Sequence, residues 1–390
     1  MPKQRQQNPI QDAITTWIAS VYPLVQKDPS WRDNLLKTAP KRFTIYEPMA
    51  LLPAGSFTQP PWTSLLQTID SHVRTTLWLL ILSRLSKAAG SELTHLAVTE
   101  GIPLHREGDD AENILRSPSG LRMLCGDFGP SETAGGDPGE EDFERALWVS
   151  TKQNGIVQTW APRWTMFSRG NVKEKARLLS FPSSSSSSSD SEQRRRWAVD
   201  LYAGIGYFVF CYASLGMRVL CWEINPWSVE GLRRGAAANR WSVRVVRGGE
   251  ELALPLGDIM AGGEQIVVFL EDNQRALRRI RMLQESGLAG DVAHVNCGFL
   301  PTSEPTWRMA WEMTDRSSDD VWLHLHENVG VQNLESRRRD LQSMLEAWAT
   351  ASPGGDARSP NVTHIEQVKT FAPGVWHCVF DVHITRPQQK

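Results

Sequence analysis

The chain has 390 residues, of which 41% are hydrophobic and 22% are charged, and its formal net charge is −2 at pH 7. Such values are typical of a globular protein of two or three domains. They exclude a protein that binds nucleic acid through a strong overall positive charge. A nucleic-acid-binding protein with this balance must gather its Lys and Arg residues on one face.

The cysteines and the apolar runs indicate the compartment. The 5 cysteines are scattered without a Cys-x-x-Cys pair, which argues against a zinc site or a disulfide framework and favours a reducing environment. The first residues lack the apolar core of a signal peptide, and no uninterrupted apolar run of about 18 residues occurs. We therefore expect a soluble, cytoplasmic protein with no membrane partner and no bound metal.

Residues 1–90 are predicted to form an N-terminal accessory region. Apolar residues recur at helical spacing between Ala13 and Leu24, and Leu77–Leu85 is an apolar helix candidate that ends near Gly90. No residue pattern in this region indicates chemistry. A structural or RNA-facing role is predicted for it.

Residues 91–180 are predicted to form a small α/β module and a basic connecting segment. Ala146–Ser150 and Gly155–Trp160 are typical of two strands joined by a tight turn. The connecting segment could contact phosphates or form a solvated helix face. Its five basic residues are Arg163, Arg169, Lys173, Lys175 and Arg177.

A serine-rich insertion is predicted at residues 181–197. The run Ser183–Ser189 has low complexity and cannot bury a core. The insertion separates the basic segment from the ligand-binding domain that is predicted for residues 198–390.

That domain opens with an apolar strand that ends at Asp200 and leads into a Gly-x-Gly turn at Gly204 and Gly206. A strand, a glycine turn and an apolar helix in this order open a doubly wound nucleotide-binding sheet. The third glycine of a dinucleotide fingerprint is missing, and Asp200 would repel a pyrophosphate. A carboxylate at this place suits a cationic or amine-bearing ligand, and S-adenosylmethionine is both.

Two further strands end in polar side chains. Arg218–Trp222 ends at Glu223, which can accept hydrogen bonds from both hydroxyls of a ribose. Gln265–Leu270 is followed by Asp272 and Asn273, and an Asp or Asn there can read the amino edge of adenine. Three apolar strands that each end in a candidate ligand favour a nucleotide site over ordinary α/β turns.

The remaining strands complete the predicted sheet. The fourth strand should place residues 296–303 at the transfer site, and the fifth, Val321–His326, ends at Glu327 and Asn328. A terminal hairpin, residues 362–384, adds an antiparallel edge. The predicted fold class is α/β: a class I methyltransferase-like (Rossmann-like) doubly wound sheet with an antiparallel terminal hairpin, preceded by a smaller α/β N-terminal region.

Four histidines lie on these strands without a cysteine or carboxylate at ligand spacing. They are predicted to be packed or hydrogen-bonded strand residues rather than metal ligands. They are His324, His326, His377 and His383.

Several runs together resemble the wybutosine-synthesising tRNA aminocarboxypropyltransferases of the fungal branch. This family is a sibling of the archaeal and eukaryotic tRNA guanine-37 N1-methyltransferases. The resemblance covers roughly residues 90–385, and the runs that carry it are residues 148–155, 160–177, 200–208, 221–236 and 324–329.

The resemblance implies a role for each site residue. The donor would be S-adenosylmethionine, with its tail at Ser168 and Lys175, its amine near Asp200 and its ribose at Glu223. Gly204 and Gly206 would admit it, and Asp272 and Asn273 would hold the adenine. Glu271, where a small residue is common, would add charge beside the adenine. The candidates for tRNA contact are Arg163, Arg169, Asn171 and Arg177.

The sulfonium of S-adenosylmethionine activates three carbons: the methyl, the ribose 5′ carbon and the γ carbon of the methionyl chain. The fold does not decide which of them is transferred, because the nucleophile takes the carbon that the pocket presents in line. The resemblance of residues 326–329 to the transferase branch favours the 3-amino-3-carboxypropyl group. Its acceptor would be C7 of 4-demethylwyosine at position 37 of tRNA(Phe), in the anticodon loop. A monomer is expected, and His326 and Glu327 are the candidates for a general base.

Two alternatives stay open on the sequence. One is a tRNA guanine-37 N1-methyltransferase, and the other is a tRNA-binding scaffold that has lost catalysis. The presence of Gly204, Gly206, Glu223 and Asp272 argues against the scaffold.

Overall fold

The computed structural model describes residues 8–25, 29–100, 118, 120–131, 136–181, 196–289, 291–317, 320–351 and 358–386. Its contacts divide the chain into two compact units. The N-terminal unit comprises Met1–Thr151 and Thr159–Phe167, and the C-terminal unit comprises Lys152–Gln158 and Ser168–Lys390. The predicted division into four parts stays a prediction, since residues 182–195 of the serine-rich insertion lie outside the described residues.

The N-terminal unit is a small α/β structure. Its described strands form a sheet in the order β1-β2-β3-β4: β1 (Thr44–Tyr46), β2 (Met49–Leu52), β3 (His95–Val98) and β4 (Arg122–Cys125). Its helices are α1 (Pro9–Val25), α2 (Pro29–Thr38), α3 (Pro60–Thr68), α4 (Ser71–Ala89) and α5 (Glu140–Arg145).

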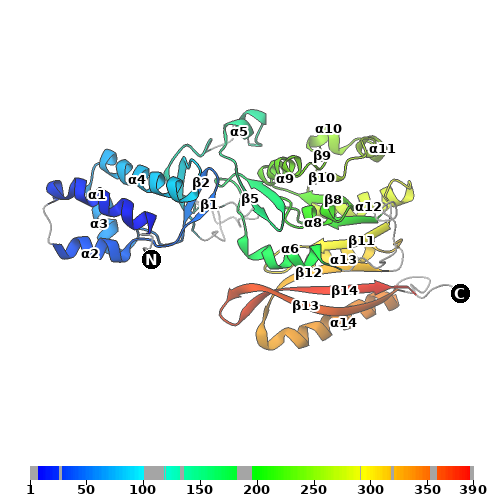
Figure 1. Cartoon of the computed structure of the whole chain (residues 1–390). Helices are drawn as coiled ribbons and strands as arrows, with labels where there is room; N and C mark the ends of the chain where they lie inside the picture. The colour runs from blue at the N-terminus through cyan, green and yellow to red at the C-terminus, as the bar shows by residue number, and fades with distance from the viewer. Residues whose placement is uncertain are drawn as a thin grey trace, which may run out of the picture. The chain divides into compact units, whose positions relative to one another are not determined.

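Helix α1 packs against α4 (Figure 1). Trp17 of α1 is fully buried, and its indole N–H donates to the carbonyl of Val73 at 3.0 Å. Helix α4 ends, as predicted, at Gly90, whose φ of 72° is the left-handed conformation that commonly caps a helix. These contacts give the unit a core of its own.

A hairpin joins strands β5 (Val149–Gln153) and β6 (Ile156–Trp160), and its residues are divided between the two units. Its turn residues, Asn154 and Gly155, have φ values of 50° and 81°, which suit a two-residue hairpin turn. The predicted strand pair and its turn are confirmed, although the first strand lies at Val149–Gln153 rather than at Ala146–Ser150. The 3-10 turn η1 (Arg169–Asn171) and helix α6 (Val172–Leu179) follow.

The C-terminal unit is built on an eight-stranded sheet in the described part of the chain. The strand order is β13-β14-β12-β11-β7-β8-β10-β9. The six strands from β12 to β9 in this order are parallel, whereas β14 is antiparallel to both β12 and β13. This is the predicted doubly wound sheet with an antiparallel terminal hairpin. The strands are β7 (Arg196–Asp200), β8 (Arg218–Glu223), β9 (Val243–Val246), β10 (Ile266–Leu270), β11 (Asp291–Cys297), β12 (Val321–Gly330), β13 (Ser359–Ala372) and β14 (Val375–Thr385).

Helices cover both faces of this sheet, so its strands are apolar on both sides. In β7, Trp197 and Val199 belong to one apolar cluster and Ala198 to the other, as the two-residue period of a strand requires. The first cluster includes residues of α12 (Ala276–Glu285), α13 (Glu304–Met313) and α14 (Leu334–Ala351). The second includes residues of α6, α8 (Val209–Ser214) and α9 (Pro226–Ala238).

The edge strand that pairs with β10 was not predicted from the sequence. Strand β9 has four residues with Arg244 among them, and it is followed by two short helices, α10 (Gly248–Leu252) and α11 (Leu256–Met260). Three of the four residues of β9 are only half-buried. The strand therefore does not need a continuous apolar run, and its sequence shows none. The added strand places the end of β10 one strand inside the sheet edge.

Candidate donor-binding and transfer site

The carboxyl ends of three neighbouring strands bring the first predicted ligand residues together. Strand β7 lies between β8 and β11, so Asp200 is flanked by the strand that ends at Glu223 and by Asn296, its partner in register. The crevice at the carboxyl ends of parallel strands is where doubly wound sheets bind ligands.

The turn after β7 needs glycine at both predicted positions. Gly204 and Gly206 have φ values of 53° and 91°, in the left-handed region that disfavours other residues. A Cβ atom at Gly206 would also lie 2.6 Å from the ring of Phe210 in α8. The turn therefore packs against α8 and leaves no room for a side chain at residue 206.

Glu223 is held by this turn. One carboxylate oxygen accepts the backbone N–H of Gly204 at 2.8 Å, and the other accepts those of Ile224 and Asn225 at 2.9 and 2.8 Å. Burial raises the pKa of Glu223, and the three N–H donors oppose that rise. An oxygen with one donor retains a lone pair, so the side chain is oriented and still able to accept a hydroxyl.

Asp200 and Asn296 leave acceptors without partners in the described structure. One oxygen of Asp200 accepts from the backbone of Tyr202 at 3.0 Å and from the Asn296 amide at 3.3 Å. The second oxygen of Asp200 and the amide oxygen of Asn296 have no hydrogen-bond partner, although both residues are fully buried. Burial raises the pKa of Asp200 to about 7. Two such acceptors match a ligand with N–H donors, as an ammonium group has.

The end of β10 presents Asp272 and Asn273. Asp272 accepts the N–H of Gln274 at 2.8 Å through one oxygen, and its side chain is exposed. The Asn273 amide donates to the carbonyl of Leu201 at 2.8 Å, which ties this loop to the end of β7. Glu271 accepts from Arg279 at 2.5 and 2.9 Å and from Trp222. The charge predicted beside the adenine is therefore balanced by an arginine.

Ser168 and Lys175 meet at Tyr207, the residue after Gly206. The backbone N–H of Ser168 donates to the Tyr207 hydroxyl at 2.9 Å, and the Lys175 ammonium lies 5.6 Å from the centre of the Tyr207 ring. Lys175 also donates to the amide oxygens of Gln153 and Gln158 at 2.6 and 2.7 Å. Burial lowers the pKa of Lys175 to about 8. The structure thus joins both residues to the glycine turn.

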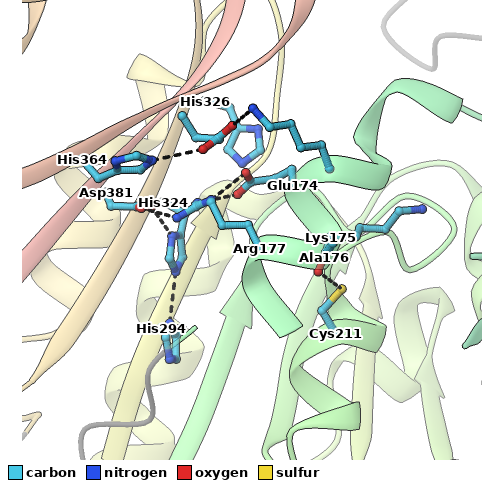
Figure 2. Close-up of polar contacts among 12 residues, drawn as sticks. Glu174, Lys175, Ala176, Arg177, Cys211, His294, His324, His326, His364 and Asp381 are labelled. Carbon is cyan, nitrogen blue, oxygen red and sulfur yellow. Dashed lines mark hydrogen bonds and ion pairs between the residues drawn. The ribbon is translucent and has the colours of Figure 1, made fainter. Parts of the chain in front are cut away.

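The four candidates for tRNA contact are divided between the two units of the chain. Arg163 belongs to the N-terminal unit, whereas Arg169 and Asn171 form the turn before α6 in the C-terminal unit. Arg177 points into the protein, where its guanidinium pairs with Glu174 and Asp381 (Figure 2). This pairing argues against a direct contact of Arg177 with phosphate.

The two candidate bases differ in their surroundings. His326 is buried, its Nδ1 is 2.9 Å from Nε2 of His377, and its Nε2 has no partner in the described structure. Its ring lies 5.2 Å from that of Phe208, which follows Tyr207, and burial lowers its pKa well below the ordinary value. Glu327 pairs with Arg337 at 2.7 and 3.0 Å. His326 is therefore the better candidate.

The strand histidines are hydrogen-bonded, as predicted. His324 contacts Asp381 at 2.7 Å and His294 at 3.1 Å, and His383 contacts Asp320 at 2.8 Å. No cluster of potential metal ligands occurs among the described residues. In the same part of the chain, no helix has the length and apolar character needed to cross a membrane.

Sequence reasoning missed one residue beside this site. Lys369 of β13 donates to the hydroxyl of Ser168 at 2.8 Å, although 201 residues separate them. Its strand was predicted, but no motif marks a lysine within a hairpin. Only the pairing of β13 with β14 in the folded sheet shows that Lys369 lies beside Ser168.

No protein-family model matches the chain. Among curated proteins, it is 39% identical over 345 residues to tRNA wybutosine-synthesizing protein 2 of Schizosaccharomyces pombe, an alignment that covers 88% of this chain and 72% of that protein. The chain belongs to this family. The Saccharomyces cerevisiae protein of the same name is 31% identical over 389 residues, covering 92% and 77% of the two chains. The resemblance predicted from the sequence is confirmed.

Solved structures confirm the fold class of this chain. TYW2 of Pyrococcus horikoshii, solved in complex with MeSAdo, has a TM-score of 0.56 at 15% identity and covers 96% of this chain and 100% of its own. A tRNA m1G37 methyltransferase of Methanocaldococcus jannaschii has a TM-score of 0.50 at 13% identity, covering 99% and 82%. At these identities the likeness concerns the fold.

Proposed function

We propose that the chain transfers the 3-amino-3-carboxypropyl group of S-adenosylmethionine to C7 of 4-demethylwyosine at position 37 of tRNA(Phe). Its family makes it an S-adenosylmethionine-dependent tRNA-modifying transferase of wybutosine synthesis. The observation that best supports this donor is the pair of unpartnered acceptors on Asp200 and Asn296 beside the glycine turn. Together they suit a ligand that carries an ammonium group.

The predicted site residues offer a partner for each part of S-adenosylmethionine: its ribose, its adenine and its methionyl tail. The remaining lone pair of Glu223 would accept a ribose hydroxyl, and the exposed oxygen of Asp272 would meet the adenine amine. Asp200 with Asn296 would take the methionyl ammonium. Ser168 and Lys175, joined through Tyr207, would take the methionyl carboxylate.

The transfer itself is a displacement at the γ carbon of the tail. The ring carbon of the base attacks that carbon, the carbon–sulfur bond breaks, and its electron pair leaves with the sulfur of 5′-methylthioadenosine. The ring then loses a proton. Because Nε2 of His326 has no partner in the described structure, whereas Glu327 is paired with Arg337, we assign His326 as the proton acceptor.

The proposed partner is the anticodon loop of tRNA(Phe), which the chain would bind as a monomer in the cytoplasm. The five cysteines, Cys125, Cys211, Cys221, Cys297 and Cys378, are all free thiols, which suits a reducing compartment.

The nucleoside released from the donor tests the reaction. The protein is incubated with S-adenosylmethionine and tRNA(Phe) that carries 4-demethylwyosine, and the small molecules are separated by chromatography. We expect 5′-methylthioadenosine, and we expect Asp200→Asn to reduce its release at least tenfold while the exposed-site control Asp258→Asn matches wild type. Release of S-adenosylhomocysteine would contradict the proposal and indicate the sibling methyltransferase. Donor binding without any release would indicate a scaffold.

A further inference from the structure

Lys369 lies where the donor's tail is proposed to bind. Its ammonium donates to the Ser168 hydroxyl at 2.8 Å. Its side chain also passes so close to Gly170 that a Cβ atom there would lie 2.4 Å from Cδ of Lys369. The turn before α6 is therefore shaped around this lysine, and glycine at residue 170 leaves room for it.

The same lysine faces the histidines at the transfer site. Lys369 and His377 are partners in register on β13 and β14, and His377 contacts His326 at 2.9 Å. Burial, and after it the charge of Lys369, lowers the pKa of His377 to about 4. The ammonium of Lys369 thus contacts the Ser168 turn, and its charge acts on both imidazoles.

Lys175 alone is a weak partner for a carboxylate. Its ammonium already donates to Gln153 and Gln158, and desolvation lowers its pKa to about 8. A carboxylate that leaves water needs strong compensation, and a second ammonium beside a hydroxyl supplies it.

We propose that Lys369 is a donor-binding residue, which holds the methionyl carboxylate together with Ser168. This rests on the proposed function in one respect, the choice of S-adenosylmethionine as donor. Held there, the tail extends toward the His326–His377 pair, so that its γ carbon rather than its methyl group faces the incoming base. Lys369 thus helps to select the group that is transferred.

Calorimetry with two ligands tests the assignment. S-adenosylmethionine carries the aminocarboxypropyl tail, and 5′-methylthioadenosine is the same molecule without it. We expect Lys369→Met to raise the Kd for S-adenosylmethionine at least tenfold and to change the Kd for 5′-methylthioadenosine less than twofold. The matched control is Lys173→Met, because Lys173 contacts Glu366 and Gln367 of the same strand and its side chain is 67% exposed. That control should bind both ligands as wild type does.

A structural role would give a different result. If Lys369→Met weakened both ligands equally, or weakened neither, the proposal would be wrong. Gly170→Ala is a second variant for the case that Lys369→Met does not fold, because its methyl group displaces the lysine while keeping the charge in the chain. We expect it to weaken S-adenosylmethionine selectively as well, and equal weakening of both ligands would again contradict the assignment.

Failure of the proposed function would be visible separately. A wild-type protein that binds S-adenosylmethionine but transfers its methyl group would contradict the aminocarboxypropyl reaction. The ratio of the two dissociation constants in Lys369→Met would still decide whether the lysine binds the tail.

Discussion

Asp200 and Lys175 are buried ionisable residues whose titration lies near neutral pH. Burial raises the pKa of the Asp200 carboxyl to about 7 and lowers the pKa of the Lys175 ammonium to about 8. The donor tail carries one charge of each sign, so each residue would gain an oppositely charged partner when the donor binds. Perturbed pKa values of this kind are common at functional sites.

This pair predicts how donor binding depends on pH. Below about pH 7 the Asp200 carboxyl is protonated in the free protein, and a proton must leave before an ammonium can pair with it. The Kd for S-adenosylmethionine should therefore rise about tenfold for each unit that the pH falls from 7 to 5. Lys175 stays protonated throughout this window, because its pKa is about 8. Calorimetry at several pH values measures the slope.

Two controls isolate Asp200 as the cause. Asp200→Asn should bind more weakly at pH 8 and show no slope between pH 5 and 7. Wild-type binding of 5′-methylthioadenosine, which lacks the ammonium, should also be flat. A slope that persists in Asp200→Asn would assign the titration to another group.

At the scale of elements, helix α6 is anchored to the terminal hairpin by buried charges (Figure 2). Arg177 of α6 pairs with Glu174 on its own helix and with Asp381 of β14, which lies 204 residues away in the chain. Asp381 also accepts from His324 of β12. Burial alone would raise the pKa of Asp381, but the hydrogen bond from His324 and the charge of Arg177 hold it below the ordinary value. These bonds fix the helix that carries Lys175.

Loss of Arg177 should therefore be costly. Arg177→Met removes the arginine from two buried carboxylates, of which Asp381 keeps only its bond to His324, and we expect the free energy of unfolding to fall by about 3–5 kcal/mol at pH 7. In the variant, burial raises the pKa of Asp381 in the folded state, so stability is lost as the pH rises above the unfolded value. The cost should consequently shrink toward pH 4. Denaturant unfolding at both pH values measures it.

Arg233→Met is the matched control. Arg233 pairs with Glu230 on α9, and its side chain is 45% exposed. Glu230 is buried but keeps Arg234 as a second partner, so loss of the half-exposed Arg233 should cost about 0–1 kcal/mol. Equal losses in the two variants, or no dependence on pH for Arg177→Met, would contradict a structural role for the buried pairs.

The elements also show what the sequence could predict. The strands that end at Asp200, Glu223 and residue 270 were predictable because each is an apolar run followed by polar residues. Strand β9 was not, because a short, half-buried edge strand with an arginine in it has no period to detect. The turn at residues 154–155 was predictable because glycine marks it.

For the whole molecule, local patterns could predict the polar residues at the strand ends but not the side chains that the terminal hairpin brings beside them. The glycine turn and the strand ends lie close together in the sequence, so a local sequence motif is enough to predict them. Lys369 and the contact of Arg177 with Asp381 depend on pairings across about 200 residues, and only the folded sheet brings them together. Arg177 was predicted as a tRNA contact for this reason, since sequence alone does not show that its side chain turns inward.

The group that enters the tRNA distinguishes aminocarboxypropyl transfer from methyl transfer. S-adenosylmethionine labelled either on its methyl group or on its methionyl carboxylate is incubated with the protein and with tRNA(Phe) that carries 4-demethylwyosine, and the radioactivity in the tRNA is counted. We expect only the carboxylate label to enter. Entry of the methyl label alone would contradict it and would make the chain a methyltransferase.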